Sequence, residues 1–383
     1  MTGGQDVRYP SPRPVTSVEP RLVILADDLT GACDAAVAFT TVCDPVRVQL
    51  NSESPEPNGV QATTTESRDL PVGEAEARIL SIVERLPSNI EFFKKIDSVF
   101  RGNTLAEIAA TLRCARYDLA ILAPSYPAVG RTVRAGILHI CDVGGDRTLP
   151  IAELLAQFGC SFAILAAGLP DDDVAATMRR CLSDSTPAIL CDASNRHDLE
   201  RVVRSARSLG KRILWIGSGG LAHALAADFP ALKSTSVLQP RPGRTIFFVG
   251  SPHPVTCTQV EHLQRTGRIV EYRSGATHSP ATDWLTPVML GETTADDIRA
   301  IAGHDPTQIG CLFMTGGDTG HVICRALGIH ALRLHREFAP GVPLATAEGG
   351  PFDGVSVVLK SGGFGEPDLL CRLLETCRPE VPA

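Results

Sequence analysis

Short apolar runs alternate with amphipathic stretches along most of the chain. Apolar runs that predict strands lie at 22–26, 46–50, 92–96, 118–123, 161–166, 187–191 and 212–216. Between them, apolar residues recur at helical spacing in the ranges 31–40, 73–86, 104–115, 171–182 and 196–209. Strands that alternate with helices favour a parallel sheet with helices on both faces. The pattern therefore predicts an α/β fold.

The alternation stops around 231–244, where a proline-rich, basic segment ends at Arg244. Beyond it the pattern resumes, with strands predicted at 245–250, 310–314 and 355–360 and a helix from about 254. We therefore expect two domains, 20–238 and 239–383, each a mainly parallel sheet flanked by helices. Residues 1–19, rich in Pro, Ser and Gly, are expected to form a flexible N-terminal tail.

Composition excludes several classes of protein. A chain of 383 residues has room for two or three domains. With a net charge of −7 and 5% aromatic residues, a nucleic-acid surface is not expected. No secretory signal is evident, and no apolar run approaches the roughly 20 residues that span a bilayer. The 12 cysteines form no C-x-x-C pair, so a reduced, cytoplasmic protein without a membrane segment is predicted.

The first candidate site follows the predicted strand 92–96. Residues 94–103 bring together Lys94, Lys95, Asp97, Ser98 and Arg101 just before a predicted helix. The carboxyl ends of strands are where open α/β sheets bind ligands. Unpaired buried charges cost several kcal/mol each, so these groups must pair with one another, face water or meet an anionic, hydroxylated ligand. Similar clusters elsewhere in the chain favour the ligand.

Three further clusters lie in the first domain. Asp27 and Asp28 directly follow strand 22–26; we expect at most one to face a ligand while the other caps the next helix, unless both are capping acids. Arg68 follows a run of hydroxyl residues and can grip a carboxylate bidentately, although a solvated charge is the alternative. Arg131 lies in the loop after strand 118–123, where a surface arginine is the alternative. Together these groups suit a small ligand with one carboxylate and several hydroxyls.

The second domain has glycine-rich strand ends. Thr315–Gly320 and Lys360–Gly365 each follow a predicted strand, and Ser251 follows another. Glycines let the backbone approach a ligand, and a helix N-terminus offers free N–H groups to an anion. We favour a nucleotide-phosphate site over tight structural turns, although no Walker A loop is present. A triphosphate then requires a divalent metal, most simply Mg²⁺, with Asp318 as its nearest carboxylate.

One loop offers a competing interpretation. Residues 217–222 fit the dinucleotide pattern G-x-G-x-x-[GA]. The acid expected about 20 residues later at the end of a strand is missing. We interpret the loop as a tight turn, and keep an NAD-dependent hydroxy-acid dehydrogenase as the first alternative. The second is a non-catalytic protein that binds an acid sugar.

Taken in order, these segments resemble the four-carbon acid-sugar kinases, the family of D-threonate, D-erythronate and 3-oxo-tetronate kinases. The resemblance rests on 27–32, 95–103, 124–131, 217–222, 250–251, 315–319 and 360–365. It implies a two-domain kinase in which the first domain binds the acid sugar, the second binds ATP, and the terminal hydroxyl is phosphorylated between them. The expected substrate-binding residues are Asp27, Arg68, Lys95, Ile96, Asp97 and Ser98, with Arg101 and Arg131 as further candidates. The expected ATP-binding residues are Ser251, Gly316, Gly317, Asp318, Thr319, Gly362 and Gly363.

Some details stay open at this point. Asp27, Asp97 and Asp318 are the candidates for a general base, with Asp318 first because it begins a helix at the glycine-rich loop. The chain departs from the family pattern in two places, at Val99-Phe100 and in a short region around 275–305. Only the second departure concerns the expected contacts with the nucleotide. The sequence decides neither the stereochemistry of the substrate nor whether the protein is a homodimer.

Overall fold

The computed structural model describes residues 21–50, 59–87, 90–114, 116–143, 145–183, 188–232, 241, 243–272, 283–288, 292–303 and 305–377. The predicted tail, the predicted domain boundary at 238/239 and much of the region around 275–305 lie outside these residues. We refer to residues 21–232 as the N-terminal half and to residues 241–377 as the C-terminal half.

A single sheet of fifteen strands runs through both halves of the described chain. In the N-terminal half its order is β2 (Val46–Gln49), β3 (Val60–Thr64), β1 (Leu22–Ala26), β4 (Glu91–Lys95), β11 (Ile213–Gly217), β5 (Leu119–Ala123), β10 (Ala188–Cys191) and β9 (Ala163–Leu165). Every neighbouring pair among these strands is parallel. The predicted parallel sheet is confirmed.

The C-terminal half continues this sheet. Its order from the outer edge is β13 (Ile269–Glu271), β14 (Asp283–Pro287), β12 (Arg244–Val249), β15 (Ile309–Thr315), β18 (Ser356–Lys360), β17 (Val342–Glu348) and β16 (Ala331–Ala339). The first five are parallel, and β16 and β17 form an antiparallel hairpin. The sequence analysis predicted neither strand of this hairpin.

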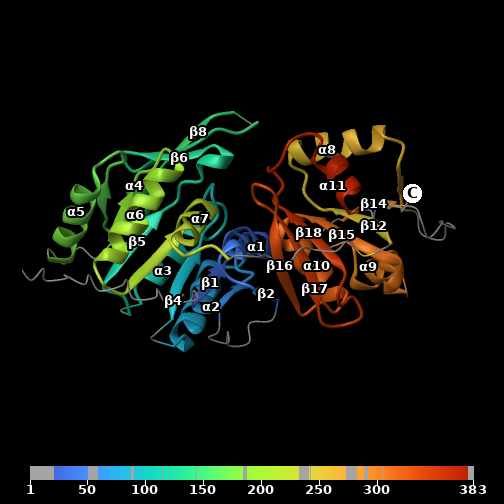
Figure 1. Cartoon of the computed structure of the whole chain (residues 1–383), viewed down its shortest axis with the longest axis horizontal. Helices are drawn as coiled ribbons and strands as arrows, with labels where there is room; N and C mark the ends of the chain where they lie inside the picture. The colour runs from blue at the N-terminus through green and yellow to red at the C-terminus, as the bar shows by residue number, and fades with distance from the viewer. Residues whose placement is uncertain are drawn as a thin grey trace, which may run out of the picture.

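The hairpin joins the two halves. β16 pairs antiparallel with β2, from Ala331 opposite Gln49 to Leu334 opposite Val46. An Arg47–Glu348 ion pair of 2.7 Å and an Arg333–Asp44 pair of 3.0 Å flank this seam. The two sheets expected from the sequence are therefore continuous at their edges (Figure 1).

Helices cover both faces of the sheet. One face of the N-terminal half carries α2 (Val72–Arg85), α3 (Thr104–Leu112) and α4 (Ile151–Ala156); the other carries α1 (Leu29–Ala36), α5 (Asp171–Ser183), α6 (Arg196–Ser208) and α7 (Gly219–Ala227). In the C-terminal half, α9 (Ala295–Ala302) and α10 (Gly317–Ala326) lie opposite α8 (Pro254–Arg265) and α11 (Leu369–Thr376). One cluster of buried apolar residues extends through both halves. Figure 1 shows α1 and β2 at the centre, beside β16.

A small antiparallel sheet stands apart from the main one. It consists of β6 (Arg131–Arg134), β7 (Ile137–Ile140) and β8 (Arg147–Pro150). Three short 3₁₀ helices lie at Val37–Thr41, Pro127–Val129 and Pro306–Gln308. Within the described ranges, no helix combines the length and the apolar character that crossing a membrane requires.

Candidate active site

The acidic turn after β1 is built around Asp28. Asp28 is the N-cap of α1, and its Oδ1 accepts a hydrogen bond of 2.7 Å from the Gly31 N–H. The Thr30 hydroxyl donates to Asp28 Oδ2 at 3.0 Å. Burial and the neighbouring Asp27 carboxylate raise the pKa of Asp28 to about 6, against the opposing charge of Arg68. We predicted that one of the two acids caps the helix while the other faces a ligand. Instead, the capping residue Asp28 also lines the pocket described below.

Arg68 binds the acidic turn directly. Its Nε donates to Asp27 Oδ2 at 2.8 Å and its Nη1 to Asp28 Oδ2 at 2.5 Å. Its Nη2 lies 3.5 Å from Asp97 Oδ2. One guanidinium therefore holds three carboxylates from two segments, the turns after β1 and β4, and its side chain is only 12% exposed. Arg68 is not the solvated loop charge that we kept as the alternative.

The two lysines of β4 point to opposite faces of the sheet, as successive strand residues must. Lys94 Nζ lies 2.9 Å from Glu107 Oε2 of α3 and is fully buried. Lys95 Nζ lies 3.4 Å from Asp34 Oδ2 of α1 and donates to the Ile96 carbonyl at 2.9 Å. Only Lys95 reaches the pocket, so the first lysine has a structural role.

Asp97 organises the turn after β4. Its carboxylate accepts from the Val99 N–H at 3.0 Å and from the Arg101 Nη2 at 2.6 Å. Burial alone would raise the pKa of Asp97, but the guanidiniums of Arg101 and Arg68 hold it well below its usual range. Asp97 is thus a permanent anion that orients two arginines, which makes it a poor proton acceptor.

Three strand ends of the C-terminal half converge at their glycines. A Cβ on Gly362 would collide with the Ser251 hydroxyl, and a Cβ on Gly250 would collide with Thr319. Gly316 has φ 102°, a conformation that favours glycine, and it precedes α10. The ends of β12, β15 and β18 are therefore packed together, as the sequence analysis required for a phosphate site.

Lys360 secures the last of these loops. It is fully buried, and its Nζ donates to the carbonyls of Ser361 at 3.0 Å and Gly362 at 2.7 Å, and to the Thr256 hydroxyl at 3.0 Å. Burial lowers its pKa to about 7, because no carboxylate among the described residues pairs with it. The sequence analysis assigned no role to this residue.

The acidic turn of the first half faces the glycine loops of the second. A Cβ on Gly317 would collide with Asp28 Oδ2, so the two segments are in direct contact. His321 of α10 lies 3.2 Å from Glu66, near Arg68. The pocket between the halves is lined by Asp28, Thr30, Gly31, Asp34, Arg68, Lys95, Asp97, Ser98, Arg101, Ser361 and Phe364. The two predicted half-sites therefore form one site.

This pocket is tight. Its volume is about 20 Å³, close to the minimum that holds a single water molecule. A larger hollow of about 690 Å³ adjoins it at Phe364 and is lined by Arg131, Gly363, Phe338, Val255 and Arg372, among others. The larger volume is in the range of small-molecule sites.

Of the site residues predicted in the first half, five line the small pocket: Arg68, Lys95, Asp97, Ser98 and Arg101. None of those predicted in the second half lines it, although Gly363 lines the larger hollow. Asp27 and Ile96 do not line the small pocket, and Arg131 lines the larger hollow instead, where it pairs with Asp142 at 3.1 Å. Asp27 Oδ1 is buried and has no hydrogen-bond partner among the described residues. No group of three or more possible metal ligands (His, Cys, Asp, Glu) occurs in the described part of the chain.

Asp318 differs from the other candidate bases. It makes no ion pair with the described residues, and burial raises its pKa despite the nearby charge of Arg68. Asp27 and Asp97, by contrast, are both bound to Arg68.

The loop that resembled a dinucleotide fingerprint is filled by protein. A Cβ on Gly219 would collide with Tyr126, and one on Gly220 with the Ser125 carbonyl. The Ser218 hydroxyl also donates to that carbonyl at 3.0 Å. These glycines let α7 pack against the 125–126 loop, which supports the tight turn that we preferred.

Several pocket residues were missed from the sequence. Asp34 lies two turns into α1 and accepts from the Tyr126 hydroxyl at 3.3 Å, and burial raises its pKa. Thr30, Ser361 and Phe364 also line the pocket. Asp34 had a detectable signal, since a carboxylate on an otherwise apolar helix face needs a partner; the others had none.

Comparison with known proteins identifies the family. The model of a sugar-binding N-terminal domain matches residues 22–225, and that of a nucleotide-binding C-terminal domain matches 285–370. A D-threonate kinase of Bordetella bronchiseptica is 30% identical over 410 residues, covering 94% of this chain and 98% of that protein. The chain belongs to the four-carbon acid-sugar kinase family. The predicted resemblance is thereby confirmed.

Other members of the family show a graded similarity. A D-threonate kinase of Cupriavidus necator is 33% identical, covering 90% of this chain and 94% of that protein. A 3-oxo-tetronate kinase of Brucella melitensis is 24% identical, covering 90% and 93%. Among solved structures, protein HI1011 of Haemophilus influenzae superposes with a TM-score of 0.64 at 19% identity, covering 93% of this chain and 100% of the other. That structure confirms the fold alone.

Proposed function

We propose that this protein transfers the γ-phosphoryl group of ATP to the terminal hydroxyl of a four-carbon acid sugar, with D-threonate as the first candidate. The observation that carries the proposal is the contact between Asp28 and Gly317, which brings the charged cluster against the glycine loops. D-threonate comes first because two D-threonate kinases are 30% and 33% identical to this chain, above the 24% of the 3-oxo-tetronate kinase.

The N-terminal half supplies the groups for the acid sugar. Arg68, Lys95 and Arg101 are the cations that line the small pocket, and Ser98 adds a hydroxyl. We infer that Arg101, which is half exposed, and Lys95 meet the substrate carboxylate and hydroxyls, while Arg68 stays bound to its carboxylates. Phosphoryl transfer depends mainly on such positioning and on neutralisation of charge.

The C-terminal half supplies the groups for ATP. α10 begins at Gly317 with its N-terminus toward the junction, and a helix N-terminus offers N–H groups to an anion. The hollow that includes Gly363 has the size that a nucleoside requires. We therefore infer that the phosphates lie at Ser251, Gly316–Thr319 and Gly362.

Mg²⁺ fits this site. The unpartnered, buried Asp27 Oδ1 is a hard oxygen of the kind that Mg²⁺ prefers, and Mg²⁺ commonly takes one or two carboxylates together with phosphate oxygens. Asp27 would hold the ion, which would neutralise charge on the phosphates. Asp318 makes no ion pair with the described residues, begins α10 beside Gly317 and has a raised pKa, so we infer that it accepts the hydroxyl proton.

Release of ADP from ATP and Mg²⁺ should be measured with D-threonate, L-threonate and D-erythronate, and ³¹P NMR should locate the phosphate in the product. Asp318→Asn is expected to lower kcat by about 10²-fold or more with little change in KM. Asp296→Asn is the matched control, because that carboxylate is 90% exposed on α9.

The alternatives give different results. Reduction of NAD by a hydroxy acid without ATP would identify a dehydrogenase. Tight binding of D-threonate without ADP release would identify a binding protein. A near-normal kcat in Asp318→Asn would remove that residue from the role of base while leaving the kinase proposal intact.

A further inference from the structure

A second pocket lies at the amino ends of the strands, opposite the carboxyl ends that carry the candidate active site. It has a volume of about 430 Å³ and is lined by Pro87, Ile90, Glu91, Arg116, Tyr117, Arg207, Lys211, Arg212, Ile213 and Trp215. These residues surround the amino ends of β4, β5 and β11, whereas the active-site residues follow the carboxyl ends. Glu91 and Lys95 mark the two ends of β4, about 13 Å apart at 3.3 Å per residue.

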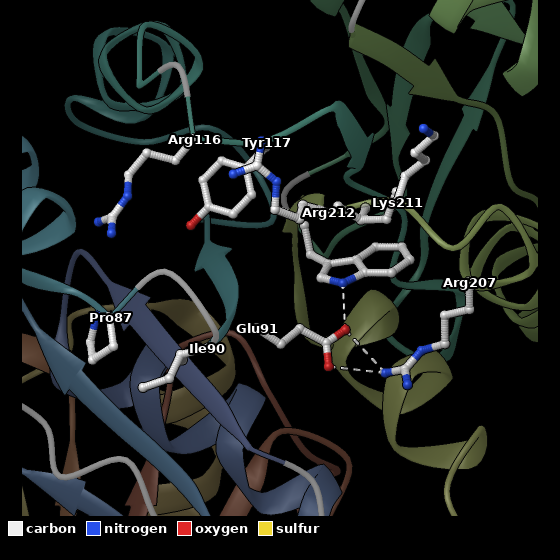
Figure 2. A pocket seen from close by; sticks show the side chains of 10 residues that line it. Pro87, Ile90, Glu91, Arg116, Tyr117, Arg207, Lys211 and Arg212 are labelled. Atoms are coloured by element: carbon white, nitrogen blue, oxygen red, sulfur yellow. Dashed lines mark hydrogen bonds and ion pairs between the residues drawn. The ribbon is translucent and has the colours of Figure 1, made fainter.

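A fixed platform forms the floor of this pocket. Glu91 accepts a hydrogen bond of 2.7 Å from the Trp215 indole N–H and one of 3.1 Å from Arg207 Nη2. Arg207 also lies 3.2 Å from Asp228 and stacks on Phe229. Figure 2 shows Glu91 between Tyr117 and Arg116 on one side and Arg207 on the other. These groups bind one another and so form a fixed wall of the pocket.

Positive charge remains after the ion pairs are counted. Arg207 pairs with Glu91 and Asp228, and Arg212 pairs with Asp118 at 3.1 Å. Neither Arg116 nor Lys211 has a carboxylate partner among the described residues. Arg116 instead donates to the last carbonyls of α2, those of Val83 and Leu86, at 2.5 Å each. The pocket therefore presents more cationic than anionic charge.

Two of the lining residues have donors with unused capacity. The Tyr117 hydroxyl and the Lys211 ammonium make no hydrogen bond or ion pair with the described residues. Burial raises the pKa of Tyr117, so its hydroxyl keeps its proton. The Tyr117 ring stacks on Phe92 with centroids 6.2 Å apart, and Ile90, Ile213 and Pro87 add apolar wall.

We propose that this pocket binds a small organic anion, with its excess positive charge attracting a phosphate or carboxylate group, the Tyr117 hydroxyl as a hydrogen-bond donor and the apolar wall against the body of the ligand. Arginine and lysine around an aromatic wall are suited to that combination of charge and carbon skeleton. The proposal is independent of the kinase reaction and of the ligands assigned to the junction of the two halves.

The chain contains an intrinsic reporter for this site. Its 2 tryptophans are Trp215, in the pocket wall, and Trp284, in β14. In a Trp284→Phe background, emission therefore reports on the pocket alone. Phenyl phosphate and succinate are the two probes, since they carry the phosphate and the carboxylate separately. If Trp284→Phe fails to fold, calorimetry on the natural chain measures the dissociation constants of the two probes instead.

Saturable, salt-sensitive quenching by at least one probe is expected. Lys211→Ser with Arg212→Ser should weaken it about tenfold or more, because both charged donors are lost. The control is Arg196→Ser with Arg265→Ser, which removes the same charge from exposed helix positions paired within their own helices. The proposal is overturned if neither probe binds below about 10 mM, or if the pocket variant binds as tightly as the control.

Discussion

Gly317 is a point of close contact between the two halves of the molecule. Its missing side chain leaves room for the Asp28 carboxylate, which is itself fixed as the cap of α1. In Gly317→Ala the added methyl must displace Asp28 or the glycine loop. We expect kcat/KM to fall about 10²-fold, since a displacement of about 1 Å at an active site has that effect. Steady-state kinetics with ATP and D-threonate measure it.

The control for that variant is Gly73→Ala. Gly73 is in the first turn of α2, and a Cβ there meets no atom within 4 Å. This substitution should leave kcat/KM unchanged and slightly raise stability, because alanine favours a helix. Equal activity in both variants would mean that the Asp28–Gly317 contact does not position the reacting groups.

Lys360 makes stability depend on pH. Its folded-state pKa of about 7 is below the ordinary lysine pKa of 10.5, so between these pH values the unfolded chain binds the additional proton. The free energy of unfolding should therefore rise with pH in this window, by at most about 1.4 kcal/mol per pH unit. Below pH 7 both states are protonated and this contribution is constant.

Urea unfolding of the natural chain and of Lys360→Met at pH 6.5, 8 and 9.5 isolates that slope, since other groups titrate in both proteins. The difference in free energy, natural chain minus variant, should increase with pH. A difference that stays constant would show that Lys360 keeps an ordinary pKa.

At the scale of the element, the two adjacent lysines of β4 have different roles. Lys94 forms a fully buried pair with Glu107, and removing one member leaves an uncompensated charge. Lys94→Met should therefore cost about 3–5 kcal/mol of stability, and Lys94→Met with Glu107→Gln should recover most of it. Glutamine can still accept the bond of 2.5 Å that Ser67 donates.

Lys95 should behave in the opposite way. Lys95 faces the pocket, so Lys95→Met is expected to abolish most activity. The double variant Lys94→Met with Glu107→Gln should remain active. Thermal unfolding and steady-state kinetics of all three proteins distinguish these roles. An active Lys95→Met protein would contradict the assignment of this face of β4 to the substrate.

At the scale of the whole molecule, the tight junction requires motion. A pocket of about 20 Å³ cannot admit a four-carbon acid, so the halves must separate or the lining must rearrange during turnover. Glu66 and His321 lie 3.2 Å apart across the junction, which makes them suitable positions for a cross-link. Glu66→Cys with His321→Cys, treated with a short bifunctional thiol-reactive reagent such as a bis-methanethiosulfonate, should lose activity.

The chain's own 12 cysteines make controls necessary. Each single variant and the natural chain, treated identically, should stay active. Retention of full activity by the cross-linked double variant, with the link verified by mass spectrometry, would show that the junction need not open.

Much of this molecule was predictable because its signals are local. Continuous apolar runs identified strands buried on both faces, and the charged or glycine-rich residues directly after β1, β4, β12, β15 and β18 identified the edge of the sheet that carries the pocket between the halves. Parallel strands place their carboxyl ends together, so neighbouring sequence was sufficient to assemble each half-site.

The remaining features depend on residues far apart in the chain. The β16–β17 hairpin was missed because its strands mix polar and apolar residues, and its pairing with β2 involves segments about 285 residues apart in sequence. The same long-range packing places Asp34 beside Lys95 and Asp28 against Gly317, and it brings Arg116 and Trp215 to the wall of one pocket. Local sequence determined which groups each strand end carries; tertiary structure decided which of them meet, because charge pairing and steric contact depend on distance in space rather than along the chain.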